Sequence, residues 1–537
     1  MHPHGQALAD LFGFALPEIA LVLFACVLFV GGLYRADRTL WSLVALAGLA
    51  IALVLHVLQP RQMASTSALA VPLLFDPLAS WTRVLALASG ALFLLLAWDE
   101  VPERHVADHH ACFLIIVAGV SLTGAANDLI ALFLALEMIS IPTYVMLYLP
   151  RHDDAAQEAS IKYFLLSVFS SAFLLFGFSY LFGLTGTTNI AGSLHALYGA
   201  TGEETKSIGG LAQIAMLMIA AGLGFRITAV PFHFYAPDVF QGASTSGAAF
   251  LSYVPKVAGF LAALRVFGFV VPEGVTLDNH QGIGLGLSDQ VPTLFWFLAA
   301  LTMTIGNLLA LLQDNLKRLL AYSSISHAGY MLVALASAPY LSAPGAANTG
   351  VAALLFYLVA YGAMTFGMFA VLAMLHRPDR PVENVDDLAG LAKTHPSLAL
   401  LIAILLFSFI GLPLTAGFTG KFFIFFGALS TDALPAPLGG AARELPGWLY
   451  PTLAVIGMLN AAIGGWYYLR IIAVMYLRTA VKPIATWGTI PGFTTLVVCI
   501  ILTLGLSIPP GLTWLLDAAK RATVSRPAPQ KVVQAER

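Results

Sequence analysis

The sequence has 537 residues, of which 59% are hydrophobic and only 10% are charged, whereas about a quarter of the residues of an ordinary globular domain are charged. This composition excludes a water-soluble globular fold and indicates a polytopic membrane protein. The formal net charge of -2, without a Lys/Arg-rich run with interleaved aromatic residues, gives no reason to expect a nucleic-acid partner.

Apolar stretches recur along the whole chain, and about 20 residues are needed for a helix to cross ~30 Å of hydrocarbon. Transmembrane β-strands would instead give alternating ten-residue segments, which do not appear, so we expect an all-α fold. The pattern predicts about fourteen transmembrane helices, over residues 17–34, 39–58, 73–98, 111–125, 128–149, 161–185, 210–240, 245–270, 292–313, 317–338, 347–375, 397–430, 448–478 and 487–507.

The basic residues of the loops predict the orientation. No Lys or Arg precedes the first apolar run, so we expect a retained helix and not a cleaved signal peptide. Loops after odd-numbered spans carry most of the Lys and Arg, which places them in the cytoplasm and both termini outside. The basic C-terminal tail argues the other way, but residues far from a span weigh less.

Two of the spans contain residues that disrupt helices. Span 210–240 holds Pro231 and Pro237, and span 397–430 holds Gly411, Pro413, Gly417 and Gly420. Because proline removes an amide donor and clashes with the preceding turn, we expect each span to be two half-helices joined by a non-helical segment. Such backbone must line a wet or polar cavity.

The two broken spans occupy matching places in the chain. Each is the fourth span of a set of five, and the sets begin near Ala111 and Pro292. Matching breaks indicate an internal repeat, and five spans, an odd number, make the two units inverted. We therefore divide the chain into a three-helix segment (1–110), a first repeat (111–270), a second repeat (292–478), and a last helix with a C-terminal tail (487–537).

Four ionisable residues lie inside apolar runs, namely Glu137, Arg226, Lys256 and Lys421. A charged side chain at the bilayer centre costs roughly 2.5 to 3.5 kcal/mol or more, and a row of such groups is the usual signature of an ion or proton path. Carboxyl and amine groups can exchange protons there, whereas a guanidinium stays charged. Glu137 and Lys256 are therefore candidate proton carriers, and Arg226 is a candidate countercharge for Glu137.

Each of these residues also has a purely structural interpretation. Glu137 could be a packing residue whose charge is neutralised by protonation or by a neighbouring cation. Lys256 could be a fixed cation paired with a buried acid, and Arg226 could form an ion pair that serves only the structure. Lys421 follows the second break and is either buried or faces water.

Several other polar residues lie near the spans. His233 and His327 are candidate proton relays, because imidazole both donates and accepts near neutral pH; the alternative is a histidine bonded to backbone at a break. Glu158 and Lys162 are four residues apart and are most simply an interfacial pair on one helix face, although Lys162 could also reach towards Glu137. Lys317 and Arg318 are interpreted as a cytoplasmic anchor.

No cofactor or metal site is predicted in this chain. Cys26, Cys112 and Cys499 are scattered over distant spans, which fits neither an iron-sulfur cluster nor a zinc site, and we expect buried apolar thiols. The run GIGLGLSD at 282–289 has no preceding strand, so it is not a dinucleotide fingerprint.

These residues carry a specific resemblance. The strings LEMISIPTYVMLY, GLGFRITAVPFHFYAPDVFQGAS, YVPKVAGF and GLPLTAGFTGKFFIF, with others in the same order over roughly residues 70 to 475, closely resemble the N-type antiporter-like membrane subunits of the proton-pumping NADH:quinone oxidoreductase, complex I. The resemblance implies a fourteen-helix fold with two inverted five-helix units in a prokaryotic inner (plasma) membrane.

The resemblance also implies roles. Glu137 would be the acid of an ion pair, Lys256 the central relay, and Lys421 the residue of the second half-channel. The family usually has lysine where this chain has Arg226, which puts in doubt any scheme that needs that cation to lose its proton.

The resemblance further implies partners and energy supply. Proton translocation would be driven by redox chemistry in other subunits, which would hold the NADH, FMN, iron-sulfur clusters and quinone, and the neighbours would be M-type and K-type membrane subunits and lipid. Two other interpretations stay open: a subunit of an Mrp-type cation/proton antiporter, or a scaffold of the membrane arm that does not pump.

Overall fold

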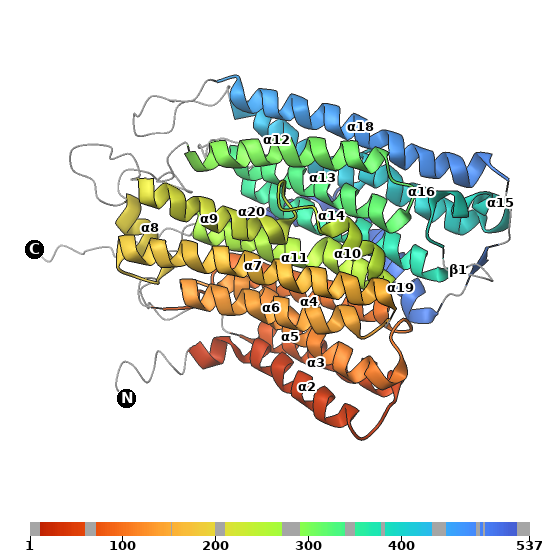
Figure 1. The fold of residues 1–537 in the computed structure, drawn as a ribbon, viewed down its shortest axis with the longest axis horizontal. Helices are drawn as coiled ribbons and strands as arrows, with labels where there is room; N and C mark the ends of the chain where they lie inside the picture. Colours follow the sequence, from red (N-terminus) through yellow and green to blue (C-terminus); the bar gives the residue numbers. More distant parts are fainter. Residues whose placement is uncertain are drawn as a thin grey trace, which may run out of the picture.

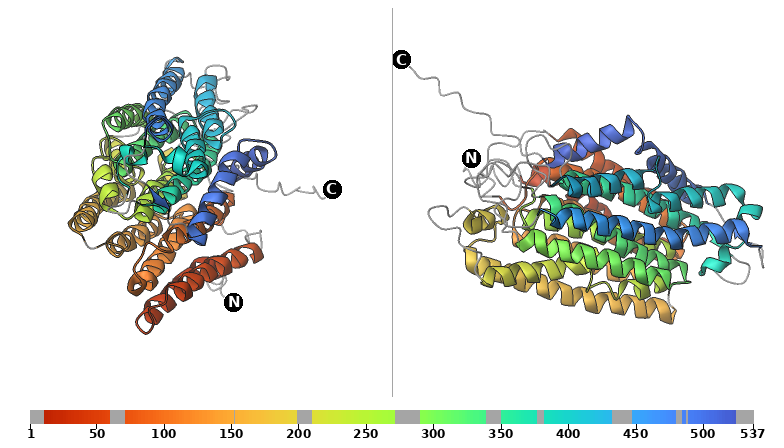
Figure 2. Two further views of the ribbon diagram at one scale, coloured as in Figure 1. Left: turned by 90° about the vertical axis from the view of Figure 1, so that its right-hand side faces the viewer. Right: turned by 90° about the horizontal axis from the view of Figure 1, so that it is seen from above.

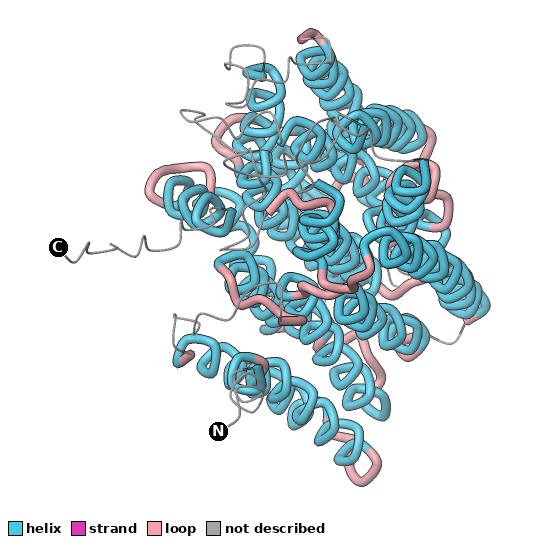
Figure 3. The backbone as a smooth tube through the Cα atoms, turned by 90° about the vertical axis from the view of Figure 1, so that its left-hand side faces the viewer, coloured by secondary structure: helices cyan, strands magenta, loops and turns pink. Residues whose placement is uncertain are grey.

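The computed structural model of the chain describes residues 11–59, 71–151, 153–198, 210–270, 290–338, 350–376, 382–431, 447–479, 484–486 and 489–523. These residues form a bundle of roughly parallel and antiparallel helices (Figure 1). Seen along the bundle, nearly all of the described backbone is helical (Figure 3).

All fourteen predicted spans appear as helices or as pairs of half-helices. Eleven described helices are long and apolar enough to cross a membrane, and α2, α19 and the α16–α17 pair supply three shorter apolar spans. The prediction of an all-α polytopic fold is confirmed. The spans are α2 (Leu16–Gly32), α3 (Arg38–Leu58), α4 (Pro77–Ala97), α5 (Val106–Ala125), α6 (Leu129–Tyr148), α7 (Asp154–Thr185), α9 (Gly210–Ile227) with α10 (Ala236–Gly242), α11 (Thr245–Val266), α12 (Gln290–Leu311), α13 (Leu316–Ser337), α14 (Gly350–Met374), α16 (Pro396–Ile410) with α17 (Ala416–Ser430), α18 (Leu449–Leu477) and α19 (Ile490–Gly505).

Short polar side chains begin many of these helices. The side chains of four aspartates and one asparagine accept hydrogen bonds from the first free backbone N–H groups of α3, α4, α6, α7 and α13. Such N-caps satisfy donors that have no partner inside the helix, which explains why these spans begin where they do. The capping residues are Asp37, Asp76, Asp128, Asp153 and Asn315.

The centre of the bundle is formed by helices that are buried on every side. Every residue of α11 after Thr245 is buried, as is 94% of the apolar window of α13 and of α14. By contrast, only a third of α3 and of α7 is buried. The N-terminal helices occupy one edge of the bundle (Figure 2, left), and α18 lies at the opposite edge (Figure 1). Any polar group on α11, α13 or α14 therefore lies deep inside the protein.

Both predicted helix breaks are present. In the first unit, residues 228–235 separate α9 from α10, and in the second unit residues 411–415 separate α16 from α17. Each link contains a residue other than glycine in the left-handed backbone region, Thr228 (φ 62°) and Leu414 (φ 69°). Such conformations are uncommon for side chains of this size, and they turn the chain sharply out of the helix in both units.

The two five-helix units repeat the same packing. In the first unit the contacting pairs are α5–α6, α6–α7, α7–α9, α9–α11 and α5–α11; in the second they are α12–α13, α13–α14, α14–α16, α16–α18 and α12–α18. The half-helices α10 and α17 also contact corresponding helices, α7 and α14. The prediction of two five-helix repeats with one broken helix each is confirmed.

Three of the residues predicted to disrupt helices do not do so. Pro237 lies in the first turn of α10, where its missing N–H would have had no partner in any case. Gly417 and Gly420 lie inside α17, where a Cβ atom would come within 2.0 Å of the Ser408 carbonyl oxygen and 2.3 Å of the Tyr357 ring respectively. These two glycines therefore allow close packing and do not end a helix.

Some expectations at the ends and surface were also wrong or lie outside the described residues. Cys26 is exposed, while Cys112 and Cys499 are buried as expected. The C-terminal tail contains a further helix that was not predicted, α20 (Gly511–Thr523), which packs against α4 and α14. The run at 282–289 falls outside the described residues.

Six smaller elements complete the described fold, two of them the 3-10 helices η2 (Glu103–His105) and η4 (Val385–Leu388). The other four join the spans or pair beside them. They are the short helices α8 (Ile190–Tyr198) and α15 (Leu391–Thr394) and a two-stranded antiparallel pair, β1 (Leu375–His376) with β2 (Ala485–Thr486), in which Leu375 lies opposite Thr486.

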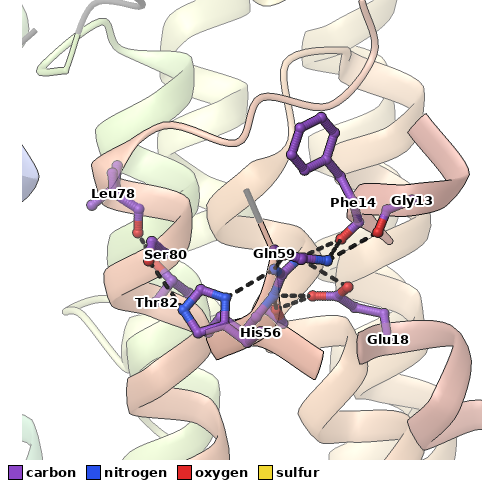
Figure 4. A network of polar contacts seen from close by, with 10 residues as sticks. Gly13, Phe14, Glu18, His56, Gln59, Leu78, Ser80 and Thr82 are labelled. Carbon is purple, nitrogen blue, oxygen red and sulfur yellow. Dashed lines mark hydrogen bonds and ion pairs between the residues drawn. The ribbon is translucent and has the colours of Figure 1, made fainter. Parts of the chain in front are cut away.

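A buried polar cluster fastens the N-terminal helices together (Figure 4). Arg83 on α4 donates to both carboxylate oxygens of Glu18 on α2, at 2.8 and 3.0 Å, and to His56 and Gln59 at the end of α3. Ser121 on α5 donates to the same carboxylate. This ion pair joins four helices and lies apart from the ionisable residues singled out in the sequence.

Candidate functional site

Glu137 and Arg226 form an ion pair between α6 and α9. Nη2 of Arg226 lies 3.2 Å from Oε1 of Glu137, and Nη1 donates to the Ser140 hydroxyl at 2.8 Å and to the Leu136 carbonyl at 3.2 Å. Ser171, on α7, donates to the same carboxylate oxygen at 2.5 Å. Three helices of the first unit therefore meet at this carboxylate.

Arg226 is placed as a fixed charge. Only 4% of its surface is exposed, and its Nε atom has no hydrogen-bond partner among the described residues. Since a guanidinium does not lose its proton in proteins, Arg226 can change the electrostatic field at Glu137 but cannot pass a proton on.

Lys256 lies on the buried helix α11 and is 1% exposed. Its ammonium donates to the carbonyl oxygen of Ser324 on α13 at 2.9 Å and also to the Ser324 hydroxyl. That hydroxyl lies 3.0 Å from Ser252 and 2.8 Å from the hydroxyl of Tyr361. Lys256 is therefore held by neutral oxygen atoms, and no described ion pair includes it.

The ion pair and Lys256 lie on neighbouring helices. Gly259 is one turn beyond Lys256 on α11, and a Cβ atom there would lie 3.3 Å from Cβ of Arg226. The missing side chain lets α11 approach α9 closely at this level. The structure thus brings Arg226 beside the turn of α11 that follows Lys256.

His327 lies on α13, one turn beyond Ser324. It continues the row of polar side chains that Lys256 and Ser324 begin, which we call the polar row. Its Nδ1 atom lies 2.6 Å from the Tyr357 hydroxyl, and its Nε2 atom lies 3.1 Å from the Tyr468 hydroxyl. The ring is 1% exposed. Both nitrogen atoms are therefore bonded to side-chain hydroxyls, and of the two predicted alternatives the backbone-bonded one does not describe this residue.

Lys421 closes the end of the half-helix α16. Its ammonium donates to the carbonyl oxygens of Phe409 and Ile410 at 2.8 and 3.1 Å, and it lies 4.6 Å from the centre of the Tyr330 ring. These carbonyls have no partner inside α16, and a cation is favourable at a helix C-terminus. Lys421 is 6% exposed, so it is buried and does not face water.

Two of the predicted site residues lie away from this row. Lys162 pairs with Glu158 at 2.6 Å and with Asp238 on α10 at 2.9 Å, as in its interfacial interpretation. Arg318 binds the same Asp238 at 2.5 Å, which agrees with an anchoring role. His233 lies in the link between α9 and α10, and its buried Nδ1 atom has no hydrogen bond to any described residue.

The sequence did not reveal the hydroxyl groups of the row. Ser324, Tyr357, Tyr361 and Tyr468 fill the space between Lys256 and His327 and come from three helices. A weak signal was present, because the tyrosines Tyr357 and Tyr361 are four residues apart and lie on one face of an apolar helix.

The two broken helices, with the partly buried Glu137 and the buried Lys256, His327 and Lys421, define an antiporter-like membrane protein. Residues 126–436 match the family described as the transmembrane part of NADH:quinone oxidoreductase and Mrp antiporters. The chain is 36% identical to NADH-quinone oxidoreductase subunit N 1 of Solibacter usitatus, over 84% of this chain and 85% of that protein. The chain belongs to the NADH-quinone oxidoreductase subunit N family.

Solved structures agree with this assignment. A chain of respiratory complex I from Thermus thermophilus with bound aureothin is 30% identical, with a TM-score of 0.71, and the match covers 94% of this chain and 99% of that one. A chain of the Mrp complex from a Dietzia species has a TM-score of 0.72 at 19% identity, covering 96% of this chain and 52% of that one. The second likeness shows a shared fold.

Proposed function

We propose that this chain is a membrane-arm subunit that translocates protons in an NADH:quinone oxidoreductase of the complex I type. The observation that carries the proposal is the set of Glu137, whose side chain is 20% exposed, and the buried Lys256, His327 and Lys421, with hydroxyl groups bonded to Lys256 and His327. Two of these four groups are amines and one is a carboxyl group, and all four can take up and release a proton. Nothing in a purely structural role requires this many titratable groups at membrane depth.

The energy for transport comes from outside the chain. Moving one charge against 100 mV requires about 2.3 kcal/mol, and we expect NADH, FMN, iron-sulfur clusters and quinone to be held by partner subunits. M-type and K-type membrane subunits and lipid are the expected neighbours. The redox chemistry would then be coupled to Glu137 and Lys256 through changes in the electrostatic field and in the packing of adjacent subunits.

The proposed location is the plasma membrane of a prokaryotic cell. The loop charges place the loops after odd-numbered spans in the cytoplasm and both termini outside. The fold agrees with an even number of spans, which puts the two ends of the chain on the same side.

Substitution of Lys256 tests the proposal. The complex carrying Lys256→Ala, reconstituted in liposomes, should oxidise NADH but lose the protons that this chain carries, measured as protons pumped per NADH. Lys393→Ala, which changes an exposed lysine on α15, is the matched control and should pump normally. Unchanged pumping by an intact Lys256→Ala complex would refute the proposal.

An Mrp-type antiporter is the second candidate, because the family match covers both classes and the fold is shared with an Mrp chain. It predicts sodium-dependent proton exchange by the purified chain alone. Copurification with NADH-oxidising subunits, without such exchange, would exclude it.

A further inference from the structure

The helix that carries Lys256 is held at both of its ends. Every residue of α11 after Thr245 is buried, and its first and last turns each bind a carboxylate that lies outside the two five-helix units. Both carboxylates belong to the N-terminal segment, whose contribution the proposed function does not explain.

At the C-terminal end of α11, Arg265 binds Asp76. Nη1 and Nη2 of Arg265 lie 2.7 and 2.6 Å from the two carboxylate oxygens, and Nε donates to the Gly124 carbonyl of α5 at 2.9 Å. The Arg265 side chain is 2% exposed. A paired guanidinium and carboxylate of this kind constrains direction as well as distance.

At the N-terminal end of α11, Glu100 accepts from the backbone. One carboxylate oxygen accepts from the Ser246 N–H at 2.6 Å and the other from the Thr245 N–H. The Ser244 hydroxyl accepts from the next N–H, that of Gly247, at 3.0 Å. The first turn of α11 is thus fully bonded, and a carboxylate is favourable at this end of a helix.

The two carboxylates flank a single helix. Asp76 is the N-cap of α4, and Glu100 follows the last residue of α4 by three positions. Since α4 is the third span and α11 the eighth, they run in opposite directions, and each end of α4 lies beside the opposite end of α11. The two helices are also in contact with each other.

We propose that Asp76 and Glu100 are positioning residues that hold α11 in one register, so that the Lys256 ammonium stays on Ser324. A slip of one residue along the helix axis would move Lys256 by about 1.5 Å, which is enough to break its 2.9 Å bond to the Ser324 carbonyl. Neither carboxylate touches Lys256, so both act through α11. The inference rests on the proposed function of Lys256.

The test uses the intact complex with Asp76→Asn and, separately, Glu100→Gln. Each should assemble, lose part or all of the proton yield per NADH that Lys256→Ala loses, and shift the pH dependence of pumping, because a displaced Lys256 meets different neighbours. The titratable or charged groups that face it from adjoining helices are Arg226, His327 and Tyr361. A role confined to stability would lower the amount of complex without changing the pH profile.

Glu18→Gln is the matched control. It breaks the buried ion pair of Glu18 with Arg83 in the same N-terminal segment. The hydrogen-bond partners of Arg83 among the described residues lie on or beside α2, α3 and α5, and none belongs to α11. The complex that assembles should keep the wild-type pH profile. If Asp76→Asn or Glu100→Gln fails to assemble, Arg265→Lys tests the same proposal in its place, since lysine keeps the charge but loses the paired hydrogen bonds.

Failure of this inference is distinguishable from failure of the proposed function. Suppose that Lys256→Ala loses pumping, but that Asp76→Asn, Glu100→Gln or Arg265→Lys keeps the wild-type pH profile and proton yield. This result would overturn only the proposed positioning of α11 by Asp76 and Glu100. Normal pumping by Lys256→Ala would overturn the proposed function, and with it the positioning role of Asp76 and Glu100.

Discussion

Arg226 shows how one residue type limits what a site can do. Its guanidinium binds Glu137, Ser140 and the Leu136 carbonyl, so it organises the carboxylate without being able to take its proton. Under the proposed function, the mobile proton belongs to the carboxylate and the amines, and the arginine supplies a constant positive electrostatic field.

Replacement of Arg226 separates its charge from its ability to exchange protons. Arg226→Lys should still pump, because a cation remains beside Glu137. Arg226→Gln should lose pumping or assembly, since removing one partner of a buried ion pair costs about 3 to 5 kcal/mol. Proton transport in liposomes measures both variants, and wild-type transport by Arg226→Gln would contradict the assigned countercharge.

The charged residues of the site could be predicted from sequence, whereas their hydroxyl partners could not. Glu137, Lys256 and Lys421 each interrupt an apolar run, so the free-energy cost of placing them in a membrane can be recognised from the neighbouring sequence alone. Tyr468 becomes a partner of His327 only because α13 and α18 pack together, and that contact joins residues more than a hundred positions apart. Lys162 was ambiguous for the same reason, since its partner Asp238 lies on another helix.

The helices were predictable in number and position because the apolar pattern repeats at span length. Wrong predictions arose from the role of glycine residues and from one amphipathic helix that was not predicted. Glycine serves both to end helices and to allow close contact, and Gly411 does the first (φ 92°) while Gly417 does the second. The helix α20 was missed because an amphipathic helix of 13 residues is too short and too polar to resemble a span.

The contact at Gly417 predicts a destabilised variant. Gly417→Ala would place a methyl group 2.0 Å from the Ser408 carbonyl oxygen, against backbone that cannot move easily, and overpacking of this kind costs about 1 to 3 kcal/mol or more. Thermal unfolding of the purified complex should begin at a lower temperature. Gly183→Ala, where a Cβ meets nothing within 4 Å, is the control, and an equal effect of both changes would contradict the packing argument.

The whole chain combines a doubled five-helix unit with helices that lie outside it. The N-terminal helices join α11 through Asp76 and Glu100, and α20 joins α4 to α14. The additional helices therefore contact both repeats and do not form a separate body.

The proposed orientation can be tested on the whole protein. With Cys26, Cys112 and Cys499 replaced by serine, Tyr34→Cys should be reached by a membrane-impermeant thiol reagent only from the cytoplasm, and Trp448→Cys, just before α18, only from outside. Both positions are exposed, at 85% and 62%. Labelling from the opposite sides would reverse the orientation, and labelling of both from one side would contradict the number of spans between them.

The environment of His327 has a consequence for the order of events. A neutral imidazole donates from one nitrogen and accepts at the other, so of its two partners, Tyr357 and Tyr468, one donates to the ring and one accepts from it. A proton that arrives at one nitrogen and leaves from the other reverses both hydrogen bonds. Under the proposed function, the ring or the hydroxyls must then turn back before a second proton can follow, so each proton that passes His327 requires this reset.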